Sequence, residues 1–270
     1  MIDIPTRSHA KIDHSNSFEA VDEQGESIVV NLVTERPLTI FVDRKEIVTL
    51  MTMGAHPELL TLGYLKNQGF FSDIAEIKLV QVDWQTNAVA VVTAKQNSNF
   101  DDQMAKRTVT SGCGQGTVFG ELIDKLVPVE KPHEKITRTD IYALLDTLSA
   151  SNQVYKKAGA VHSCGLCIAG ELEYFVEDVG RHNAVDTIAG YMWLNQIQTD
   201  NAVFYTTGRL TSEMVIKMSQ MAVPFLLSRS GATQMGVEMA QKSGITMLSR
   251  AKGKRFNVLN GAENIDFTVA

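Results

Sequence analysis

The stretch "LEYFVEDVGRHNAVDTIAGYMWL" (172–194) contains the element order that decides the fold of this chain. An apolar, strand-forming run ends in the polar junction "EDVGRHN" (177–183), and a helix-forming run follows it. The same order recurs around "TTGRLTS" (206–212) and "SRSGAT" (228–233), and this alternation predicts a parallel or mixed sheet with helices packed on it. The predicted strands are 160–169, 172–178, 201–206, 223–228 and 245–249, and the predicted helices are 181–194, 211–222 and 232–243.

The N-terminal half differs in composition and predicts a smaller, β-rich domain. Residues 27–52 are rich in Val, Ile and Thr, residues 76–95 alternate as a hairpin does, and residues 56–70 have helical spacing. The fold class is therefore α/β, or α+β over the whole chain, in two domains. The predicted division is a polar N-terminal arm at 1–26, a β-rich domain at 27–135 with a long mobile cysteine loop at 96–117, and an α/β domain at 136–270.

Composition and charge exclude several classes of function. The chain has 270 residues, of which 44% are apolar and 21% charged, as in an ordinary globular protein. A net charge of −6 argues against general nucleic-acid binding, so any anion site must be a local concentration of positive charge. The N-terminal residues lack the apolar core of a secretory signal, and no apolar run reaches the roughly 20 residues that cross a bilayer. We therefore expect a cytoplasmic protein that does not act at a membrane.

The three strand-to-helix junctions share glycine, arginine and small polar side chains, a composition suited to anion binding. Glycine permits close approach to the backbone, and each following helix offers unpaired N–H groups and the positive end of its dipole. In open α/β sheets, ligands bind beyond the carboxyl ends of the strands. We predict that Arg181, Arg209 and Arg229 converge on one anion there. His182 and Asn183 of the first junction belong to the same predicted site, and the alternative is that each arginine pairs with a surface carboxylate.

A fourth segment, "SRAKGKRF" (249–256), concentrates positive charge in an acidic protein. It contains Arg250, Lys252, Lys254 and Arg255 and no acid. Its size suits a diphosphate or a dinucleotide, and one phosphate-rich ligand would account for all four segments. A solvated turn is the alternative interpretation. The chain has neither a P-loop nor a Gly-x-Gly-x-x-Gly motif, so the sequence indicates neither ATP hydrolysis nor a Rossmann mode of dinucleotide binding.

Two of the three cysteines lie close together in "HSCGLC" (162–167). An odd number of cysteines in a reducing compartment does not predict a disulfide framework. If this segment is a strand, Cys164 and Cys167 point to opposite faces, which favours two small buried thiols over a zinc site. His162 shares a face with Cys164 and is either a core histidine or a polar group that lines a pocket.

The third cysteine, Cys113 in "TSGCGQGT" (110–117), is the better candidate nucleophile. Its glycine neighbours leave the sulfur accessible, and Lys106 and Arg107 can lower the pKa of the thiol. An accessible thiol on a loop suits a carrier that visits two partners, whereas a protease-type nucleophile needs a fixed base beside it. An incidental loop cysteine is the alternative.

Five motifs together resemble the FdhD family, the formate dehydrogenase accessory sulfur carriers. The resemblance runs in order over most of the chain from about residue 30, and the first of the motifs is the most specific. The motifs are "EDVGRHNAVD" (177–186), "GRLTSEMVIK" (208–217), "SRSGATQMGVEMAQKSGIT" (228–246), "GKRFNV" (253–258) and "SGCGQGT" (111–117).

The resemblance implies a sulfurtransferase-like carrier that takes persulfide sulfur from a cysteine desulfurase. The sulfur then passes to a substrate, the molybdenum bis-molybdopterin guanine dinucleotide cofactor, before that cofactor enters formate dehydrogenase. The family's persulfide-bearing cysteine corresponds to Cys113. Its cofactor-contacting stretch corresponds to Arg250–Arg255, including Ala251 and Gly253. No metal of the protein's own is implied.

The resemblance also bears on assembly and on the release of sulfur. The resemblance implies a homodimer. It also implies that the C-terminal domain is similar to the three-layer α/β fold of cytidine deaminases. Many members carry Cys-Gly-x-Cys in the loop, whereas this chain has Gly116 in place of the second thiol. Carriage by a single cysteine is therefore the expected scheme, without an internal disulfide.

Two other functions stay open at the level of sequence. His162 and the Cys-x-x-Cys suggest a zinc hydrolase of the deaminase type, although such enzymes need His-x-Glu and residue 164 is Cys. A non-catalytic protein that only delivers the molybdenum cofactor is the second alternative, and it predicts that Cys113 is dispensable.

Overall fold

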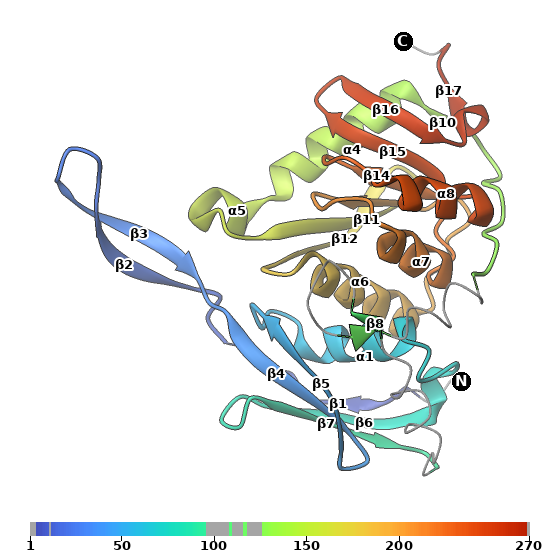
Figure 1. The fold of residues 1–270 in the computed structure, drawn as a ribbon. Helices are drawn as coiled ribbons and strands as arrows, with labels where there is room; N and C mark the ends of the chain where they lie inside the picture. Colours follow the sequence, from blue (N-terminus) through green and yellow to red (C-terminus); the bar gives the residue numbers. More distant parts are fainter. Residues whose placement is uncertain (1–3, 11, 96–107, 110–115, 118–125, 269–270) are drawn as a thin grey trace.

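The computed structural model describes residues 4–10, 12–95, 108–109, 116–117 and 126–268, and it contains two main sheets (Figure 1). The first sheet has five strands in the order β1-β6-β7-β4-β5. Every second residue of β4 from Leu38 to Val42 is buried, as expected of a strand that turns one side to a core. The elements of this half are β1 (Thr6–Arg7), β4 (Arg36–Val42), β5 (Lys45–Thr52), α1 (Pro57–Asn67), the 3-10 helix η1 (Ile74–Glu76), β6 (Ile77–Asp83) and β7 (Ala88–Thr93).

The second sheet has six strands in the order β12-β11-β13-β14-β15-β16. Its three central strands β13, β14 and β15 are parallel, and the strands on either side of them are antiparallel. The strands are β11 (His162–Ile168), β12 (Glu171–Asp178), β13 (Val203–Thr206), β14 (Phe225–Ser228), β15 (Thr246–Lys252) and β16 (Arg255–Asn260). The helices are α4 (Arg138–Ser151), α5 (Gln153–Ala158), α6 (Arg181–Asn195), α7 (Ser212–Gln220) and α8 (Gln234–Ser243).

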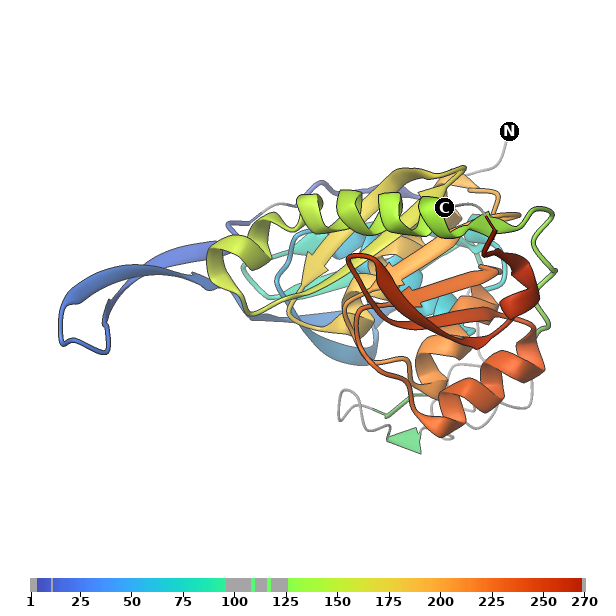
Figure 2. The same ribbon diagram turned by 90° about the horizontal axis from the view of Figure 1, so that it is seen from above.

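Helices cover the second sheet on both faces, with α4 on one side and α8 on the other in Figure 2. Cys164 and Phe204 pack with apolar residues of α6, α7 and α8. Cys167 and Tyr205 belong to the opposite face and pack with α4. Consecutive strand residues alternate between faces, so each face of this sheet is apolar and buried. The predicted mixed α/β class is confirmed.

A tight crossing of α1 and α6 joins the two halves of the molecule (Figure 1). A Cβ atom on Gly63 would lie 1.7 Å from the backbone oxygen of Asp186, and one on Gly190 would lie 2.0 Å from that of Leu59. Only glycine at both positions lets the helix backbones approach so closely. The two halves therefore share a helix pair and are not merely linked by the chain.

Two segments lie differently from the predicted division. Residues 126–135, which the sequence analysis assigned to the β-rich domain, pack on the second sheet's helices. There Val129 is buried in their core and its N–H donates to the oxygen of Ser243 at 2.8 Å. In the predicted N-terminal arm, β1 joins the first sheet in parallel to β6, and β2 (Ser15–Val21) pairs with β3 (Ser27–Val33). Polar composition concealed β1 and β2, whereas β3 lies in the run 27–52 that was predicted as strands.

Five short elements complete the described chain. β10 (Ile136–Thr137) pairs in parallel with β17 (Ile265–Asp266), which follows the 3-10 helix η2 (Ala262–Asn264). β8 (Thr108–Val109) pairs with β9 (Gly116–Thr117). Among the residues that the structure describes, no helix is both long and apolar enough to span a membrane.

Candidate functional site

The three predicted junctions lie at one edge of the second sheet, on its left side in Figure 1. β13 and β14 are parallel and in register from Val203 to Thr206, so their carboxyl ends are neighbours. The N–H of Arg229 donates to the oxygen of Thr206 at 3.1 Å, and the N–H of Arg250 donates to the oxygen of Ser230 at 2.8 Å. On the other side, the start of β11 is paired with the end of β12, His162 opposite Asp178. Tertiary structure therefore brings segments from four distant parts of the chain to one edge.

Small hydroxyl residues hold the two central junctions in one conformation. The Thr206 hydroxyl accepts from the N–H of Gly208 at 3.0 Å. The Ser228 hydroxyl donates to the oxygen of Gly208 at 2.6 Å and accepts from the N–H of Ser230 at 2.9 Å. Leu210 forms a parallel bridge with Ala232, which ties the loops together before α7 and α8 begin. Side-chain hydrogen bonds, together with this bridge, therefore hold the backbone of both junctions.

The positive charge of the junctions acts on His162, which lines one cavity together with Arg229. Burial lowers the pKa of His162, and the positive charges of Arg181 and Arg209 lower it further. Arg181 is buried against Gly208, where a Cβ atom would lie 2.7 Å from the Cδ of the arginine. Arg209 and Arg229 are exposed. The edge therefore combines one guanidinium fixed by packing with two that face solvent.

His182 is the other histidine at this edge, and it is 6% exposed. Its Nε2 lies 3.5 Å from Oε2 of Glu213, and neither ring nitrogen has a hydrogen-bond partner among the described residues. Burial, followed by the charges of Lys217 and Arg181, lowers the pKa of His182 well below its usual value. The His182 ring is therefore neutral near pH 7, and guanidinium groups supply the positive charge of the site.

The remaining residues of "EDVGRHN" have structural partners. The Glu177 carboxylate accepts from three N–H groups at the start of α5, at 2.8–3.0 Å. Asp178 accepts from the Thr52 hydroxyl at 2.6 Å and from the N–H of Met53 at 3.1 Å. Asn183 donates to the oxygen of Met51 at 2.7 Å and to Asp178 at 2.9 Å. These contacts use the amide nitrogen of Asn183, which the sequence analysis assigned to the anion site, to hold the two halves together.

A buried ion pair lies behind the junctions. Lys217 of α7 donates to both carboxylate oxygens of Asp186 at 2.8 and 2.7 Å, and Asn67 of α1 donates to the same carboxylate at 2.8 Å. Both members of the ion pair are almost completely buried. Three helices therefore meet at one charge-assisted cluster, which fixes the position from which Arg181 and His182 extend.

A cavity of about 330 Å³ opens at the same edge. His162 lines it, with Nδ1 3.5 Å from the Thr207 hydroxyl, and Tyr155 of α5 lies at its rim and is exposed. Neither Tyr155 nor Thr207 is among the predicted site residues. The one signal in the sequence that could have identified Thr207 is its position as a hydroxyl residue next to Gly208 in "TTGRLTS". The lining residues are Asn152, Tyr155, Val161, His162, Thr207, Arg229 and Ser230.

The basic run forms a β-hairpin between β15 and β16. Lys252 pairs with Arg255, so Gly253 and Lys254 make the turn, and Gly253 has a φ of +56°. Arg250 has a φ of +51° and lies where the pairing of β15 with β16 is irregular. Its N–H donates to the oxygen of Ser230, and within this run Arg250 alone is hydrogen-bonded to the junctions.

Exposure along the hairpin differs from residue to residue. Arg250 and residues 252–255 are exposed, whereas Ala251 is 1% exposed in the core beneath α4. Ala251 can therefore offer a ligand only its backbone, and the cations of the run extend outward along the hairpin.

Cys113 lies outside the described residues, as do Lys106 and Arg107. On either side of it in the sequence, Thr108–Val109 and Gly116–Thr117 pair in an antiparallel ladder. These two short strands lie within 96–117, where the sequence predicts one loop.

The other two cysteines are buried on opposite faces of the sheet. Burial raises the pKa of the Cys164 thiol and that of the Cys167 thiol to about 12. Cys164 also donates to the Thr206 hydroxyl at 3.3 Å. The described residues contain no cluster of three or more His, Cys, Asp or Glu side chains that could hold a metal. Because Cys164 and Cys167 cannot reach one ion, they do not make the zinc site of a deaminase-type hydrolase.

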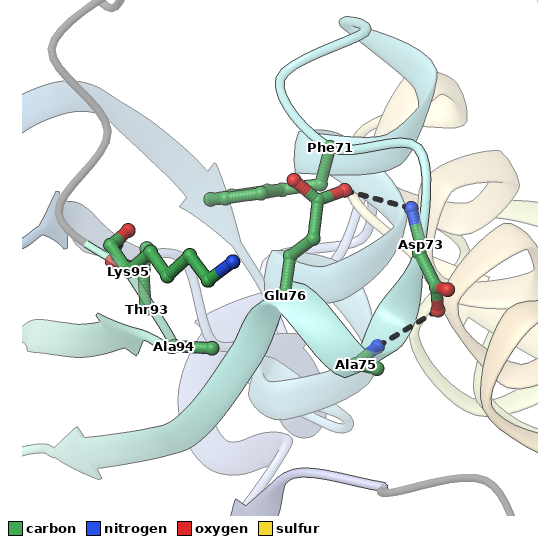
Figure 3. A pocket seen from close by; sticks show the side chains of 7 residues that line it. All are labelled: Phe71, Asp73, Ala75, Glu76, Thr93, Ala94 and Lys95. Atoms are coloured by element: carbon green, nitrogen blue, oxygen red, sulfur yellow. Dashed lines mark hydrogen bonds between the residues drawn. The ribbon is translucent and has the colours of Figure 1, made fainter.

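A second hollow, of about 460 Å³, lies beside the first sheet (Figure 3). Its carboxylates belong to a local turn: Glu76 accepts from the N–H of Asp73 at 2.8 Å, and Asp73 accepts from the N–H of Ala75 at 2.9 Å. This reciprocal capping accounts for both acids. The hollow is lined by Phe71, Asp73, Ala75, Glu76, Thr93, Ala94 and Lys95.

Comparison with known proteins identifies the family. The model of the FdhD/NarQ family matches residues 33–266, which include every junction of the sheet edge. The chain belongs to the FdhD/NarQ family. A protein of Listeria innocua named sulfur carrier protein FdhD is 28% identical over 98% of this chain and its own full length. A Bacillus pumilus protein of the same name is 32% identical over 87% of this chain and 90% of its own.

The fold of the family is also seen in a solved structure. The crystal structure of a formate dehydrogenase accessory protein from Desulfotalea psychrophila matches with a TM-score of 0.75 and 26% identity. The match covers 93% of this chain and 98% of the other. The arrangement of both sheets is therefore that of a relative over nearly its whole length.

Proposed function

We propose that this protein is a sulfur carrier that loads sulfur on Cys113 and passes it to a molybdenum cofactor bound at the edge of the second sheet. The FdhD/NarQ relatives that are named sulfur carriers support the first half. The observation on which the choice of cysteine rests is that Cys164 and Cys167 are buried and have thiol pKa values of about 12. A thiol with so high a pKa is a poor nucleophile near pH 7, so Cys113 is the candidate.

Loading follows thiol–disulfide exchange. The Cys113 thiolate attacks the outer sulfur of a persulfide on a cysteine desulfurase, forms a new sulfur–sulfur bond and releases the donor cysteine as a thiolate. In the second transfer that bond would break with the Cys113 sulfur leaving as a thiolate, and a reduced metal of the bound substrate would supply the electron pair for the outer sulfur and be oxidised by two electrons. Formate dehydrogenase is the proposed client, because the solved relative is named as an accessory protein of that enzyme.

The cofactor in this proposal is bis-molybdopterin guanine dinucleotide, a substrate with several phosphates. Arg181, Arg209 and Arg229 face its phosphates, and Arg250 extends the same positive edge toward the hairpin. The preorganised backbone of the junctions and the helix N-termini that follow them favour negative charge. Binding thus supplies proximity between the metal end of the cofactor and the loaded sulfur.

Substitution of Cys113 tests the proposal. We expect Cys113→Ser to abolish labelling when the protein is incubated with a desulfurase and ³⁵S-cysteine, and to leave the melting temperature and GDP binding unchanged. Cys167→Ala, which removes a buried thiol on the α4 face, is the matched control and should still be labelled. Mass spectrometry of tryptic peptides locates the sulfur. Label on Cys164 or Cys167 would refute the assignment, and client activation by Cys113→Ser would favour a protein that only delivers the cofactor.

A further inference from the structure

Asp178 is the residue at which the two halves of the molecule and the sheet edge meet. It is the last residue of β12, it is 3% exposed, and it pairs across the ladder with His162, which lines the cavity at that edge. Its carboxylate accepts hydrogen bonds from four donors at 2.6 to 3.1 Å. A buried charge is stable only when it is hydrogen-bonded, so the carboxylate and its donors hold one another in place.

Each oxygen of this carboxylate serves one half of the molecule. Oδ2 accepts from the hydroxyl of Thr52, the last residue of β5, at 2.6 Å and from the N–H of Met53 at 3.1 Å. Oδ1 accepts from the N–H of Gly180 at 3.0 Å and from the side-chain amide of Asn183 at 2.9 Å, both at the start of α6. One planar group therefore joins the first sheet to the first turn of α6.

The donor set favours the ionised form of Asp178. Three of the four donors are N–H groups, which cannot accept a proton from a carboxylic acid. The fourth, the Thr52 hydroxyl, already accepts from the N–H of Gly54 at 3.1 Å, which leaves its proton for the carboxylate. Burial raises the pKa of Asp178, and the four hydrogen bonds act in the opposite direction. Both oxygens therefore act as acceptors.

The first turn of α6 depends on this carboxylate. The N-cap residue is Gly180, which offers no side chain to cap the helix. Asp178 instead binds the N–H of Gly180 and the side chain of Asn183, three residues further on. Arg181 and His182 are the first two residues of the helix and lie between these two attachment points. The hydrogen bonds of Asp178 therefore fix the backbone from which both side chains extend to the edge.

We propose that Asp178 is the positioning residue through which the first sheet holds Arg181 at the anion-binding edge. The inference rests on the proposed binding of the cofactor there, and it adds that the edge is complete only while this carboxylate joins the two halves. Asp178 acts through Arg181 and not on the ligand, because its negative charge repels phosphate. A guanidinium binds phosphate through a planar fork of donors, so a loosened first turn weakens binding although no ligand contact is removed.

The sign of the effect separates positioning from charge. Removal of a negative charge near the edge should by itself strengthen the binding of an anion, whereas loss of the hydrogen bonds to α6 should weaken it. Asparagine at position 178 keeps one acceptor oxygen. With that oxygen turned toward α6, only the N–H of Met53 lacks an acceptor, because the Thr52 hydroxyl can accept from the new amide. The opposite orientation would leave both α6 donors unpaired, so Asp178→Asn should keep α6 in place.

Calorimetry with GDP tests the proposal. We expect Asp178→Ala to weaken GDP binding about tenfold and Asp178→Asn to restore most of that affinity. Asp43→Ala is the matched control, because Asp43 accepts from both the N–H and the hydroxyl of Thr93 in the first half. It should lower the melting temperature and leave the affinity unaltered. Stronger binding by both Asp178 variants, unaltered affinity in Asp178→Ala, or equal weakening by both would each overturn the proposal.

A second measurement needs no nucleotide, so it distinguishes a failure of this inference from a failure of the proposed function. Phenylglyoxal modifies accessible guanidinium groups, and Arg181 is 8% exposed. We expect Asp178→Ala to raise the modification rate of Arg181 about fivefold in peptide mass spectrometry, and Asp178→Asn to stay near the wild-type rate. An unchanged rate in Asp178→Ala would contradict the positioning role. Absence of GDP binding in the wild type, with Arg181 responding as expected, would instead contradict the proposed cofactor site.

Thr52→Val keeps the proposal testable if Asp178→Ala fails to fold. It removes one donor on the side of the first sheet and leaves the charge of Asp178 in place. We expect GDP binding to weaken about threefold and the modification of Arg181 to become faster. Thr39→Val, which removes a hydroxyl paired with that of Thr49 in the same sheet, is the matched control and should change neither. Equal behaviour of the two threonine variants would contradict a link between the first sheet and the edge.

Discussion

The junction at 177–183 and the basic run at 250–255 were predicted as parts of one anion site, yet the structure uses them in different ways. In the first segment Glu177, Asp178 and Asn183 are buried and hydrogen-bonded within the protein. The buried Asp186, which follows the segment in α6, pairs with Lys217. In the second, four of six residues are exposed cations on a hairpin. In the proposed function, the first segment positions the ligand and the second attracts it. We therefore expect the first to control stability and the second to control affinity.

The largest effect should come from the buried ion pair behind the first segment. Replacing Lys217 by Met leaves the Asp186 carboxylate buried without its cation, which typically costs about 3–5 kcal/mol. We expect a loss of that size in the free energy of unfolding by urea denaturation. Lys252→Met, on the exposed hairpin, is the matched control and should change it by less than about 0.5 kcal/mol. Similar losses in both variants would end the distinction between the two segments.

Affinity should respond in the opposite way. Two unit charges about 4 Å apart in water interact with about 1 kcal/mol, so each cation removed near a phosphate should weaken binding about fivefold. We expect Lys252→Ser with Lys254→Ser to weaken GDP binding in calorimetry at low salt, to reduce its salt dependence and to leave the melting temperature unchanged. Lys242→Ser, in the last turn of α8, is the control with unaltered affinity. Unaltered affinity in the double variant would remove the hairpin from the site.

The smallest effect should be a dependence of stability on pH from His182. Burial lowers the pKa of this imidazole well below its usual value of 6.5, so between the two pKa values the unfolded chain binds a proton that the folded chain does not. The contribution to stability is complete above pH 6.5 and is lost as pH falls below it. We expect His182→Gln to show a shallower fall in unfolding free energy between pH 7 and pH 5 than the wild type. Parallel curves would mean that His182 titrates normally.

Some features were predictable because they depend on local pattern. Apolar runs that alternate with polar junctions predicted the strands and helices of the second sheet, and the strand period placed Cys164 and Cys167 on opposite faces. The glycine and arginine of each junction also marked the edge where the segments meet, because the carboxyl ends of parallel strands share one side of a sheet.

Other features could not be predicted because they depend on partners distant in the sequence. Asn183 has the composition of an anion ligand, and only the position of Met51 shows that its amide joins the two halves. Tyr155 belongs to the cavity because Glu177, 22 residues away, caps the helix that carries it. Strand β2 lies in the segment 1–26 that was predicted as a polar arm, because its apolar residues share a face with those of β3 only after the two strands pair.

The amino-acid sequence by itself determined the class of fold, the family and the chemical groups available to the site, since these follow from local periodicity and residue type. Tertiary structure alone decided which of those groups hold the architecture and which face a ligand. The physical reason is that a side chain has one set of hydrogen-bond donors and acceptors, and folding assigns them according to what lies within about 3 Å. A motif names the groups, and packing determines their partners.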